Sequence, residues 1–515
     1  MALYSSQHLY VPPMYSGSDG VWQKDFLDVI SREKPAISWD LSAILSLISF
    51  GYACGDRTLI KQVRRQPWLS TIQENNTVKL EEVPPHDFYW DSSENIAAKL
   101  RILLEDEAQA VCKDRTEIYV LLSGGLDSRI VAGILANLYQ KGKLLAKPKS
   151  ITWGIENSRD VAYADLVART LGMENIKIGL SIDDIKNNLF AAAELLGNLV
   201  SPYHLHKMLW CGRLGKDAMV INGSYGDSVG RGEYSKRHLL ELDYLTPKDQ
   251  YRLLNPALLK TATDDLKADL EEVRKRVPTK PKYSQCEVTL QSQYMRGLIA
   301  HAMSVIDHFC SFYSMYTAPD VYRFMWRIHP SARNNRVYAR LLNDLNPQLA
   351  NIPWARSNKP LQGNAYGVRP NLNKKFHHYE DWIAELLEDD IFGLFDPQWF
   401  HDTGIFSRAG IENLRLAAIE KSPSFRYDIV LWLCSFRILT EKLEETQKAP
   451  LVETSTETFK PKISLDVYPN QFYKLRLRLR ENRFLASIVP KCRKFFTKVK
   501  ALITYPPKKM KPGSN

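Results

Sequence analysis

The fold is decided by residues 117–135, which read EIYVLLSGGLDSRIVAGIL. Residues 118–122 are a short apolar run, typical of a parallel strand that is buried on both faces. Residues 128–139 carry apolar side chains at helical spacing. Between these two runs, adjacent glycines allow the backbone to turn sharply and to approach a ligand closely. The stretch therefore predicts a strand, a glycine turn and a helix in direct succession.

The turn itself, SGGLDS at residues 123–128, has the properties of a phosphate-binding loop. Ser123 and Ser128 offer hydroxyls, and the new helix points its first N–H groups outward. It is not a P-loop of the GxxxxGK[ST] type, because no lysine follows the glycines. Asp127 suits such a site if it holds Mg²⁺. The alternative is a plain strand-to-helix turn in which Asp127 or Ser128 caps the helix.

This hexapeptide resembles the pyrophosphate-binding loop of the ATP pyrophosphatases, and in particular that of the synthetase domain of the asparagine synthetase family. The resemblance implies that the chain binds ATP together with Mg²⁺. It also implies a set of nucleotide-binding residues in the loop, namely Ser123, Gly124, Gly125, Leu126, Asp127 and Ser128.

The fold class that we expect is α/β, with a parallel-sheet nucleotide-binding core of the ATP pyrophosphatase, HUP-like kind. Strand patterns at 150–154 and 175–180 alternate with a helix pattern at 160–171, which favours right-handed crossovers and a ligand at the carboxyl ends of the strands. The segment from 151 is similar to the family segment beside adenine, which implies nucleoside contacts for Trp153 and Gly154. An ordinary buried strand end is the alternative. Residues 291–439 are expected to form a mostly helical half.

A second strand-and-glycine segment follows at residues 220–230, VINGSYGDSVG. Its Gly223 would approach the ligand, and the resemblance implies that Asp227 shares Mg²⁺ with Asp127. The alternative is that Asp227 only caps a helix.

The second segment departs from the family pattern, which is close to SGEGxDE. The first Glu of that pattern is associated with proton handling when the amine attacks, and Ser224 stands there in this chain. A serine hydroxyl is no base at neutral pH, so we hypothesise that Tyr225 or the more distant Glu233 assists a non-standard amine or acceptor. The alternative for Tyr225 is packing against the helical half.

Residues 346–360 resemble the family segment that supplies a basic residue to phosphate, which makes Arg356 and Lys359 candidates. A cation there would stabilise charge that develops between the α- and β-phosphates. The alternative is a surface loop with solvated cations. An HxH pair, His204 and His206, has no third ligand at metal spacing nearby, so we expect a helix start there.

Three regions are expected along the chain. Residues 93–450 form the ligase domain. Residues 1–92 contain a capped helix, a Gly-Asp turn and a hairpin, and FGYACGDRTL at 50–59 resembles the segment that ends a glutaminase domain. Since Met1 is followed by Ala2 and no N-terminal cysteine, we expect no glutaminase in the chain. Residues 451–515 form a basic tail.

The charge distribution separates the tail from the body. From Phe459 onward, fifteen Lys or Arg stand against Asp466 and Glu481, so the tail carries +13 and the rest of the chain 11 − 13 = −2. A near-neutral body gives no reason to propose a nucleic-acid substrate. Residues 490–503 resemble a helix that lies on an anionic membrane; a solvated tail and a partner-binding helix are equally open.

Seven cysteines without paired spacing, no signal peptide and no apolar span favour a cytoplasmic protein, either free or held peripherally at the inner membrane by its tail.

These observations predict an ATP-dependent amide-bond-forming ligase, similar to asparagine synthetase. It would adenylate a carboxylate and transfer ammonia or an amine to it, with release of AMP and pyrophosphate. The nitrogen source would be free ammonia, a separate glutaminase or an amine on the acceptor, and the carboxylate would belong to a small molecule, a glycan or a peptide. Two alternatives stay open: an ATP-dependent cyclase or surface-glycan- or peptide-modifying ligase, and a catalytically silent binding module.

Overall fold

The computed structural model describes residues 4–5, 8–33, 37–233, 246–276, 282–363, 367, 371–388, 393–422 and 425–447. All of them belong to one compact unit. The predicted basic tail, with its membrane-helix pattern, lies outside the described residues.

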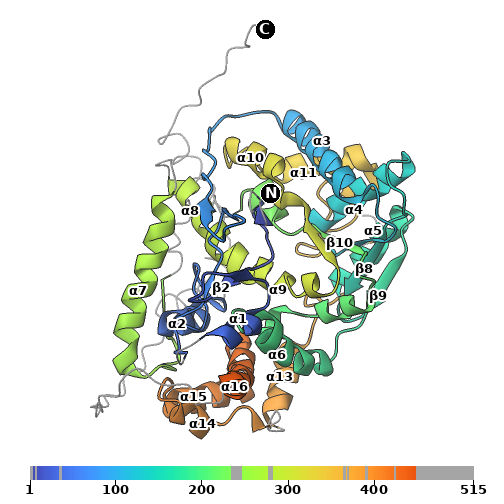
Figure 1. The fold of residues 1–515 in the computed structure, drawn as a ribbon. Helices are drawn as coiled ribbons and strands as arrows, with labels where there is room; N and C mark the ends of the chain where they lie inside the picture. Colours follow the sequence, from blue (N-terminus) through green and yellow to red (C-terminus); the bar gives the residue numbers. More distant parts are fainter. Residues whose placement is uncertain are drawn as a thin grey trace, which may run out of the picture. The chain divides into compact units, whose positions relative to one another are not determined.

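The largest sheet has five parallel strands in the order β11-β10-β7-β8-β9, and it lies on the right in Figure 1. The strands are β7 (Ile118–Leu121), β8 (Lys149–Trp153), β9 (Asn175–Ile178), β10 (Met219–Asn222) and β11 (Ser311–Ser314). β7 is buried along its whole length, as a central parallel strand with both faces covered should be. The chain runs outward from β7 through β8 to β9, and then returns to the other side of β7 with β10 and β11. The order of the strands therefore reverses between β7 and β10, and the expected α/β core is confirmed.

β11 was not expected, because residues 291–439 were assigned to a mostly helical half. Its four residues, SFYS, are too few for a period-two pattern to stand out beside the helices around it. It pairs in parallel with β10, from Ser311 opposite Met219 to Ser314 opposite Asn222. Ser314 Oγ also donates to Ser224 O at 3.3 Å, so β11 supports the loop that follows β10.

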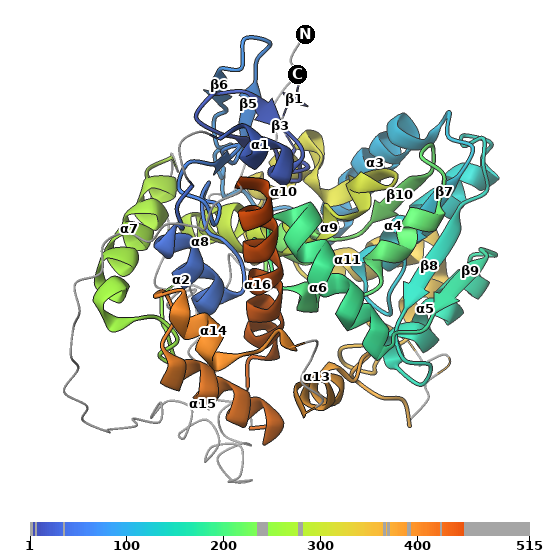
Figure 2. The ribbon, with the colours of Figure 1, turned by 60° about the horizontal axis from the view of Figure 1, so that its bottom comes forward.

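The helices next to the sheet include the two predicted at 128–139 and 160–171, whose ends are shifted by one residue. The helices of this group are α3 (Ser93–Cys112), α4 (Asp127–Gln140), α5 (Arg159–Thr170), α6 (Ile182–Leu196) and α11 (Asn335–Leu345). Helices α3, α4 and α11 pack against one another, whereas α6 packs along α16 (Tyr427–Gln447), as Figure 2 shows.

The remaining helical elements come mainly from the second half of the chain. They are α7 (Pro256–Lys275), α8 (Lys282–Leu290), the π-helix η5 (Gln291–Ala300), α9 (His301–Met303), α10 (Pro319–Arg327), α12 (Pro347–Asn351), α13 (Tyr379–Glu388), α14 (Pro397–Asp402) and α15 (Arg408–Ile419). Shorter turns are η1 (Pro202–His204), η2 (Met208–Arg213), the π-turn η3 (Gly226–Gly230), η6 (Ile306–His308) and η7 (Met315–Thr317).

The N-terminal segment forms two small antiparallel sheets and two helices. One sheet has the order β1-β5-β6 (Tyr4–Ser5, Ser70–Ile72, Val78–Leu80), and the other has the order β3-β2-β4 (Trp22–Gln23, Tyr15–Ser16, Arg64–Arg65). The helices are α1 (Phe26–Arg32) and α2 (Leu41–Phe50). The predicted hairpin is β5–β6, and the predicted capped helix is α2, which Asp40 caps.

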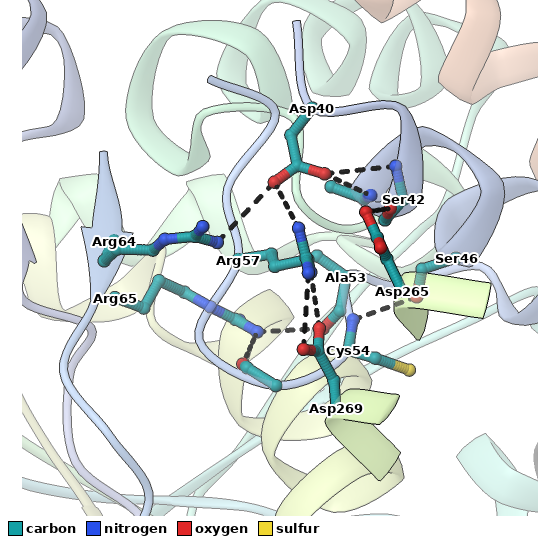
Figure 3. A network of polar contacts seen from close by, with 12 residues as sticks. Asp40, Ser42, Ser46, Ala53, Cys54, Arg57, Arg64, Arg65, Asp265 and Asp269 are labelled. Atoms are coloured by element: carbon teal, nitrogen blue, oxygen red, sulfur yellow. Dashed lines mark hydrogen bonds and ion pairs between the residues drawn. The ribbon is translucent and has the colours of Figure 1, made fainter. Parts of the chain in front are cut away.

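A polar network fixes the turn after α2 (Figure 3). Asp40 accepts from Ser42 N at 3.0 Å as the helix cap and from Arg57 Nη1 at 2.9 Å with its other oxygen. Arg57 also pairs with Asp269 on α7. Arg65 donates to the carbonyls of residues 53 and 55 at 2.8 and 2.7 Å. The FGYACGDRTL run is therefore a rigid connector that joins α2, β4 and α7.

The same connector holds η5. Arg296, on η5, donates to Gly55 O at 3.1 Å and to Asp56 Oδ1 at 2.8 Å. Gln293 accepts from Gly55 N at 2.6 Å. A Cβ atom on Gly297 would lie 2.5 Å from the ring of Tyr52, so helix and connector are in close contact. The N-terminal segment thus sets the position of a π-helix, an element that is often found at functional sites.

Candidate active site

A cavity of about 340 Å³ opens at the carboxyl ends of β7, β8 and β10, where the strand order reverses. Open α/β sheets bind their ligands at such a point. The cavity brings together most of the site residues predicted from the sequence: Ser123, Gly125, Asp127, Ser128, Trp153, Gly223, Tyr225 and Asp227. Residues of η5 close it on the other side, among them Tyr294 and Ile299.

The loop after β7 is held by its own serines. Ser128 Oγ accepts from Ser123 N at 3.2 Å and lies 3.1 Å from Ser123 Oγ, which accepts from Gly125 N at 3.1 Å. The N-cap position of α4 is Leu126, and no side chain caps the helix. The first N–H groups of a fourteen-residue helix are therefore available to an anion in the cavity.

The loop after β10 lies against this first loop, backbone to backbone. A Cβ atom on Gly223 would lie 2.5 Å from Ser128 N and 2.6 Å from the carbonyl carbon of Asp127. A Cβ atom on Gly226 would overlap the Asp127 carboxylate. Only glycine allows both approaches, and this explains why the second loop is rich in glycine.

Two carboxylates face the cavity from these loops. Burial, opposed by the nearby Arg231, raises the pKa of Asp127. Burial, together with the Asp127 charge, raises the pKa of Asp227 to about 6. Asp127 Oδ1 is buried and has no hydrogen-bond partner. An orphaned carboxylate oxygen beside a second carboxylate is a position that a cation would stabilise.

Arg231, which follows η3, compensates part of this negative charge. Its Nη2 lies 3.2 Å from Asp127 Oδ2, and its Nη1 lies 2.7 Å from Glu233 Oε1. The guanidinium is 5.4 Å from the ring centroid of Tyr338 and 5.2 Å from that of Trp354. Burial would lower the pKa of Arg231, but the surrounding acids, Asp127 first, outweigh burial and raise it. Arg231 is thus a permanent cation against Asp127.

The residues present fit a magnesium–nucleotide complex. Mg²⁺ usually takes one or two carboxylates and completes its shell with phosphate and water. Asp127 Oδ1 and Asp227 would supply the carboxylates, and the serine loop with the start of α4 would hold the phosphates. The described residues contain no group of three His, Cys, Asp or Glu side chains that could hold a metal without such help.

Tyr225 lines the cavity but is not arranged as a base. It is 1% exposed, its φ is 72°, and its hydroxyl has no hydrogen-bond partner. Burial raises its pKa above the ordinary value, so the hydroxyl stays protonated. Tyr225 can therefore donate a hydrogen bond to a ligand. Glu233, the other candidate, is engaged by Arg231 and by Arg356 at 3.4 Å and does not line the cavity.

Five predicted residues do not line the cavity. Gly124 is packed against Ala355, Leu126 is in the core, and Gly154 donates to Ile178 O at 3.2 Å. Arg356, with a side chain that is 65% exposed, lies over the ring of Trp354, and Lys359 is exposed.

The segment that carries Arg356 and Lys359 is nevertheless fixed beside the first loop. Arg129 of α4 is fully buried and donates to Ile352 O at 2.7 Å and to Pro353 O at 2.9 Å. Ala355 N donates to Gly124 O at 3.0 Å. The backbone of the segment is thus in place, whereas both candidate cations are exposed and are not among the residues that line the cavity.

The segment of the HxH pair forms a 3-10 turn, η1, and not the start of an α-helix; His204 is the last residue of this turn and His206 follows it. His206 Nδ1 lies 3.0 Å from Tyr379 Oη, and burial lowers the pKa of His206 to about 3. His206 is therefore neutral and serves packing in an aromatic cluster.

Several residues of the site were not predicted. Asp160 and Asn222 line the cavity, and Phe376 reaches it from a segment more than 140 residues away from the second loop. Arg231 comes directly after the second glycine loop, residues 220–230. A cation next to a loop that carries a carboxylate was a sequence signal from which this site residue could have been predicted. No local pattern marks Phe376, because only the tertiary fold brings it to the site.

Comparison with known proteins finds a family match over the part of the chain that holds both loops. The family model "Asparagine synthase" matches residues 99–340. A curated relative, the asparagine synthetase [glutamine-hydrolyzing] of Gallus gallus, is 32% identical over 85 residues, which are 16% of this chain and 15% of that protein. The chain thus matches only a small part of that relative.

Among solved structures, the NH3-dependent NAD synthetase of Campylobacter jejuni, in complex with the nitrate ion, matches 37% of this chain and 98% of its own. The sequence identity is 17% and the TM-score is 0.21. Because these values are low, we assign the architecture from the strand order of this chain and not from that match. No described helix is long and apolar enough to cross a membrane. Residues 99–340 form an ATP pyrophosphatase-type domain of the asparagine synthase family, a family of ATP-dependent amide-forming ligases.

Proposed function

We propose that this protein adenylates a carboxylate with ATP and then transfers ammonia or an amine to it, forming an amide and releasing AMP and pyrophosphate. The observation that supports this most is the meeting of two loops at the switch point of the sheet. One loop offers hydroxyls and free helix N–H groups, and both offer a carboxylate.

In the first step, a carboxylate oxygen attacks the α-phosphorus of ATP, and the bond between the α- and β-phosphates breaks. The departing pyrophosphate carries negative charge, which the N–H groups at the start of α4 and the hydroxyls of Ser123 and Ser128 stabilise. Mg²⁺, held by Asp127 and Asp227, would neutralise phosphate charge. Arg231 opposes the rise in the pKa of Asp127 and holds its second oxygen.

In the second step, the amine nitrogen attacks the acyl carbon, AMP leaves with the bonding electrons, and the nitrogen loses a proton. Tyr225 cannot act as the base, because burial raises the pKa of its hydroxyl and the hydroxyl therefore stays protonated. We assign it the role of a hydrogen-bond donor to the substrate, and the released AMP phosphate is a base that the reaction itself supplies.

The test is carboxylate-dependent pyrophosphate release from ATP, measured with a panel of small, peptide and sugar carboxylates. Asp127→Asn should reduce release on any active carboxylate by about 10²-fold or more, since a charge that acts in the transition state is lost. The matched control is Asp114→Asn, at a side chain that is 86% exposed and outside the cavity.

Two results would count against the proposal. Equal rates for Asp127→Asn and Asp114→Asn would remove the loop from the mechanism. ATP binding without pyrophosphate release on every carboxylate would favour the silent binding module instead. Product mass then separates simple amidation from cyclisation, because a cyclase incorporates no external nitrogen.

A further inference from the structure

A second cavity, of about 430 Å³, lies beside the cavity of the active site. It is bounded by η1, η5, the start of α13 and the start of α16. Seven of its eleven lining residues are apolar, and five of these are aromatic: Phe50, Tyr203, Tyr294, Phe425 and Tyr427. Its volume lies in the range that binds small organic ligands.

The two cavities share part of their walls. Tyr294 and Ile299, both on η5, line both cavities. An aromatic chain also connects them. Phe376 of the first cavity packs edge to face on His377 at 4.7 Å, and His377 packs on Tyr203 of the second cavity at 5.7 Å. A molecule in the second cavity would therefore lie next to the nucleotide.

Each charged group that lines the second cavity has an ionic partner: Arg426 and Asp428 pair with each other, and Glu380 pairs with Lys375, which lies outside the lining. Arg426 and Asp428 form a two-point pair with distances of 2.7 and 2.6 Å. Glu380 lies 2.5 Å from Lys375 Nζ. Burial lowers the pKa of His204, which leaves its ring neutral. Among the described lining residues, no cation is left unpaired for a second carboxylate such as the side chain of aspartate.

Resting on the proposed function, we propose that this second cavity binds the body of the substrate that reacts with ATP, and that this body is aromatic or apolar and uncharged. The reacting group would reach the nucleotide past Tyr294 and Ile299. An aromatic wall gains free energy from burying a ring and from edge-to-face contacts, whereas a small charged amino acid would lose its hydration without an ionic partner.

The test uses N-acetyl-tryptophanamide, an uncharged aromatic probe, with aspartate as the contrasting ligand. Binding to the full chain is measured by calorimetry, with and without a non-hydrolysable ATP analogue. The probe should bind in both conditions with affinities within about threefold of each other, because the cavities are adjacent but separate. Aspartate should bind at least about tenfold more weakly than the probe.

Phe425→Ala removes one aromatic wall and should weaken probe binding by about tenfold. The matched control is Phe190→Ala, on α6 at a side chain that is 44% exposed and outside both cavities. Leu298→Trp fills the same cavity from η5 and gives an independent test if Phe425→Ala does not fold.

Three outcomes would overturn the inference: competition between the probe and the ATP analogue, equal probe binding by Leu298→Trp and wild type, or aspartate that binds as tightly as the probe. Failure of the ATP analogue to bind would instead refute the proposed function. It would leave the comparison of probe binding between Phe425→Ala and Phe190→Ala unaffected, so the two failures can be told apart.

Discussion

The ion pair between Glu287 and Arg333 links the stability of the molecule to the position of the second loop. Both side chains are fully buried, and Arg333 donates to the two carboxylate oxygens of Glu287 at 2.7 Å each. His86 Nε2 lies 3.0 Å from one of these oxygens. Arg333 also donates to Val229 O, in η3, at 3.2 Å. We therefore predict that Glu287→Gln lowers both the stability and the activity of the site.

The magnitude follows from the pKa of Glu287. Burial alone would raise this pKa, but Arg333, with the hydrogen bond from His86, lowers it to about 2. Against an ordinary value of about 4.3, this corresponds to about 3 kcal/mol of favourable interaction for the ionised form. Removing one partner of a buried pair costs about 3–5 kcal/mol, because the other charge is left uncompensated. We expect Glu287→Gln to lower the free energy of unfolding by about 3 kcal/mol at pH 7.

The pH dependence has a defined sign. Because the pKa of Glu287 is lower in the folded state, its contribution is complete above the unfolded-state pKa and is lost as the pH falls towards about 2. The difference between wild type and Glu287→Gln should therefore be largest above about pH 5 and should shrink at lower pH. Urea unfolding monitored by circular dichroism at several pH values measures this difference.

The matched control is Glu441→Gln, at an exposed pair on α16. Glu441 lies 3.0 Å from Arg437 Nε, and its side chain is 50% exposed. Its loss should cost less than about 1 kcal/mol. The reasoning would be refuted if the two variants unfolded at the same urea concentration at pH 7, or if the deficit of Glu287→Gln did not change with pH.

Three further predictions concern the site and the tail. Gly223→Ala should weaken binding of the ATP analogue by more than about tenfold, since the new Cβ would force the two loops apart, whereas Gly179→Ala, at a position with open space around it, should bind normally in the same calorimetric assay. Arg296→Gln should increase proteolysis around η5, as measured by limited digestion against wild type. In calorimetry, the loss of free energy of probe binding should exceed the loss of free energy of unfolding. If the tail binds anionic lipid, the full chain should sediment with anionic vesicles in a salt-dependent manner, and truncation after Thr458 should abolish this without loss of pyrophosphate release.

The sequence predicted those parts of the fold that depend on local pattern. The strand, loop and helix of residues 117–140 are present with shifts of one residue at their ends, because buried strands and amphipathic helices each have a recognisable sequence pattern. Glycine and carboxylate together marked the second loop. β11 was not predicted, because four residues are too few to show a period-two pattern and its place is set by pairing with β10.

The contacts between distant segments were beyond local pattern. Asp127 was expected as a metal ligand, but its pairing with Arg231 depends on a contact over 104 residues. Arg356 and Lys359 were named because the segment resembled a phosphate-contacting one. The structure holds the backbone of that segment in place, while the two side chains are exposed outside the cavity lining. A motif thus predicted the location of a segment better than the direction of its side chains.

The π-helix η5 connects the N-terminal segment to the active site, although the N-terminal segment contributes no lining residue to the active-site cavity. The connector after α2 binds Gln293 and Arg296 of η5. Tyr294 and Ile299 of the same helix line both cavities. A shift of the connector would therefore move the wall that the nucleotide cavity and the aromatic cavity share. One rigid element, η5, contacts both cavities. Changes in the N-terminal segment should therefore affect the position of the two substrates relative to each other more than the affinity for either substrate alone.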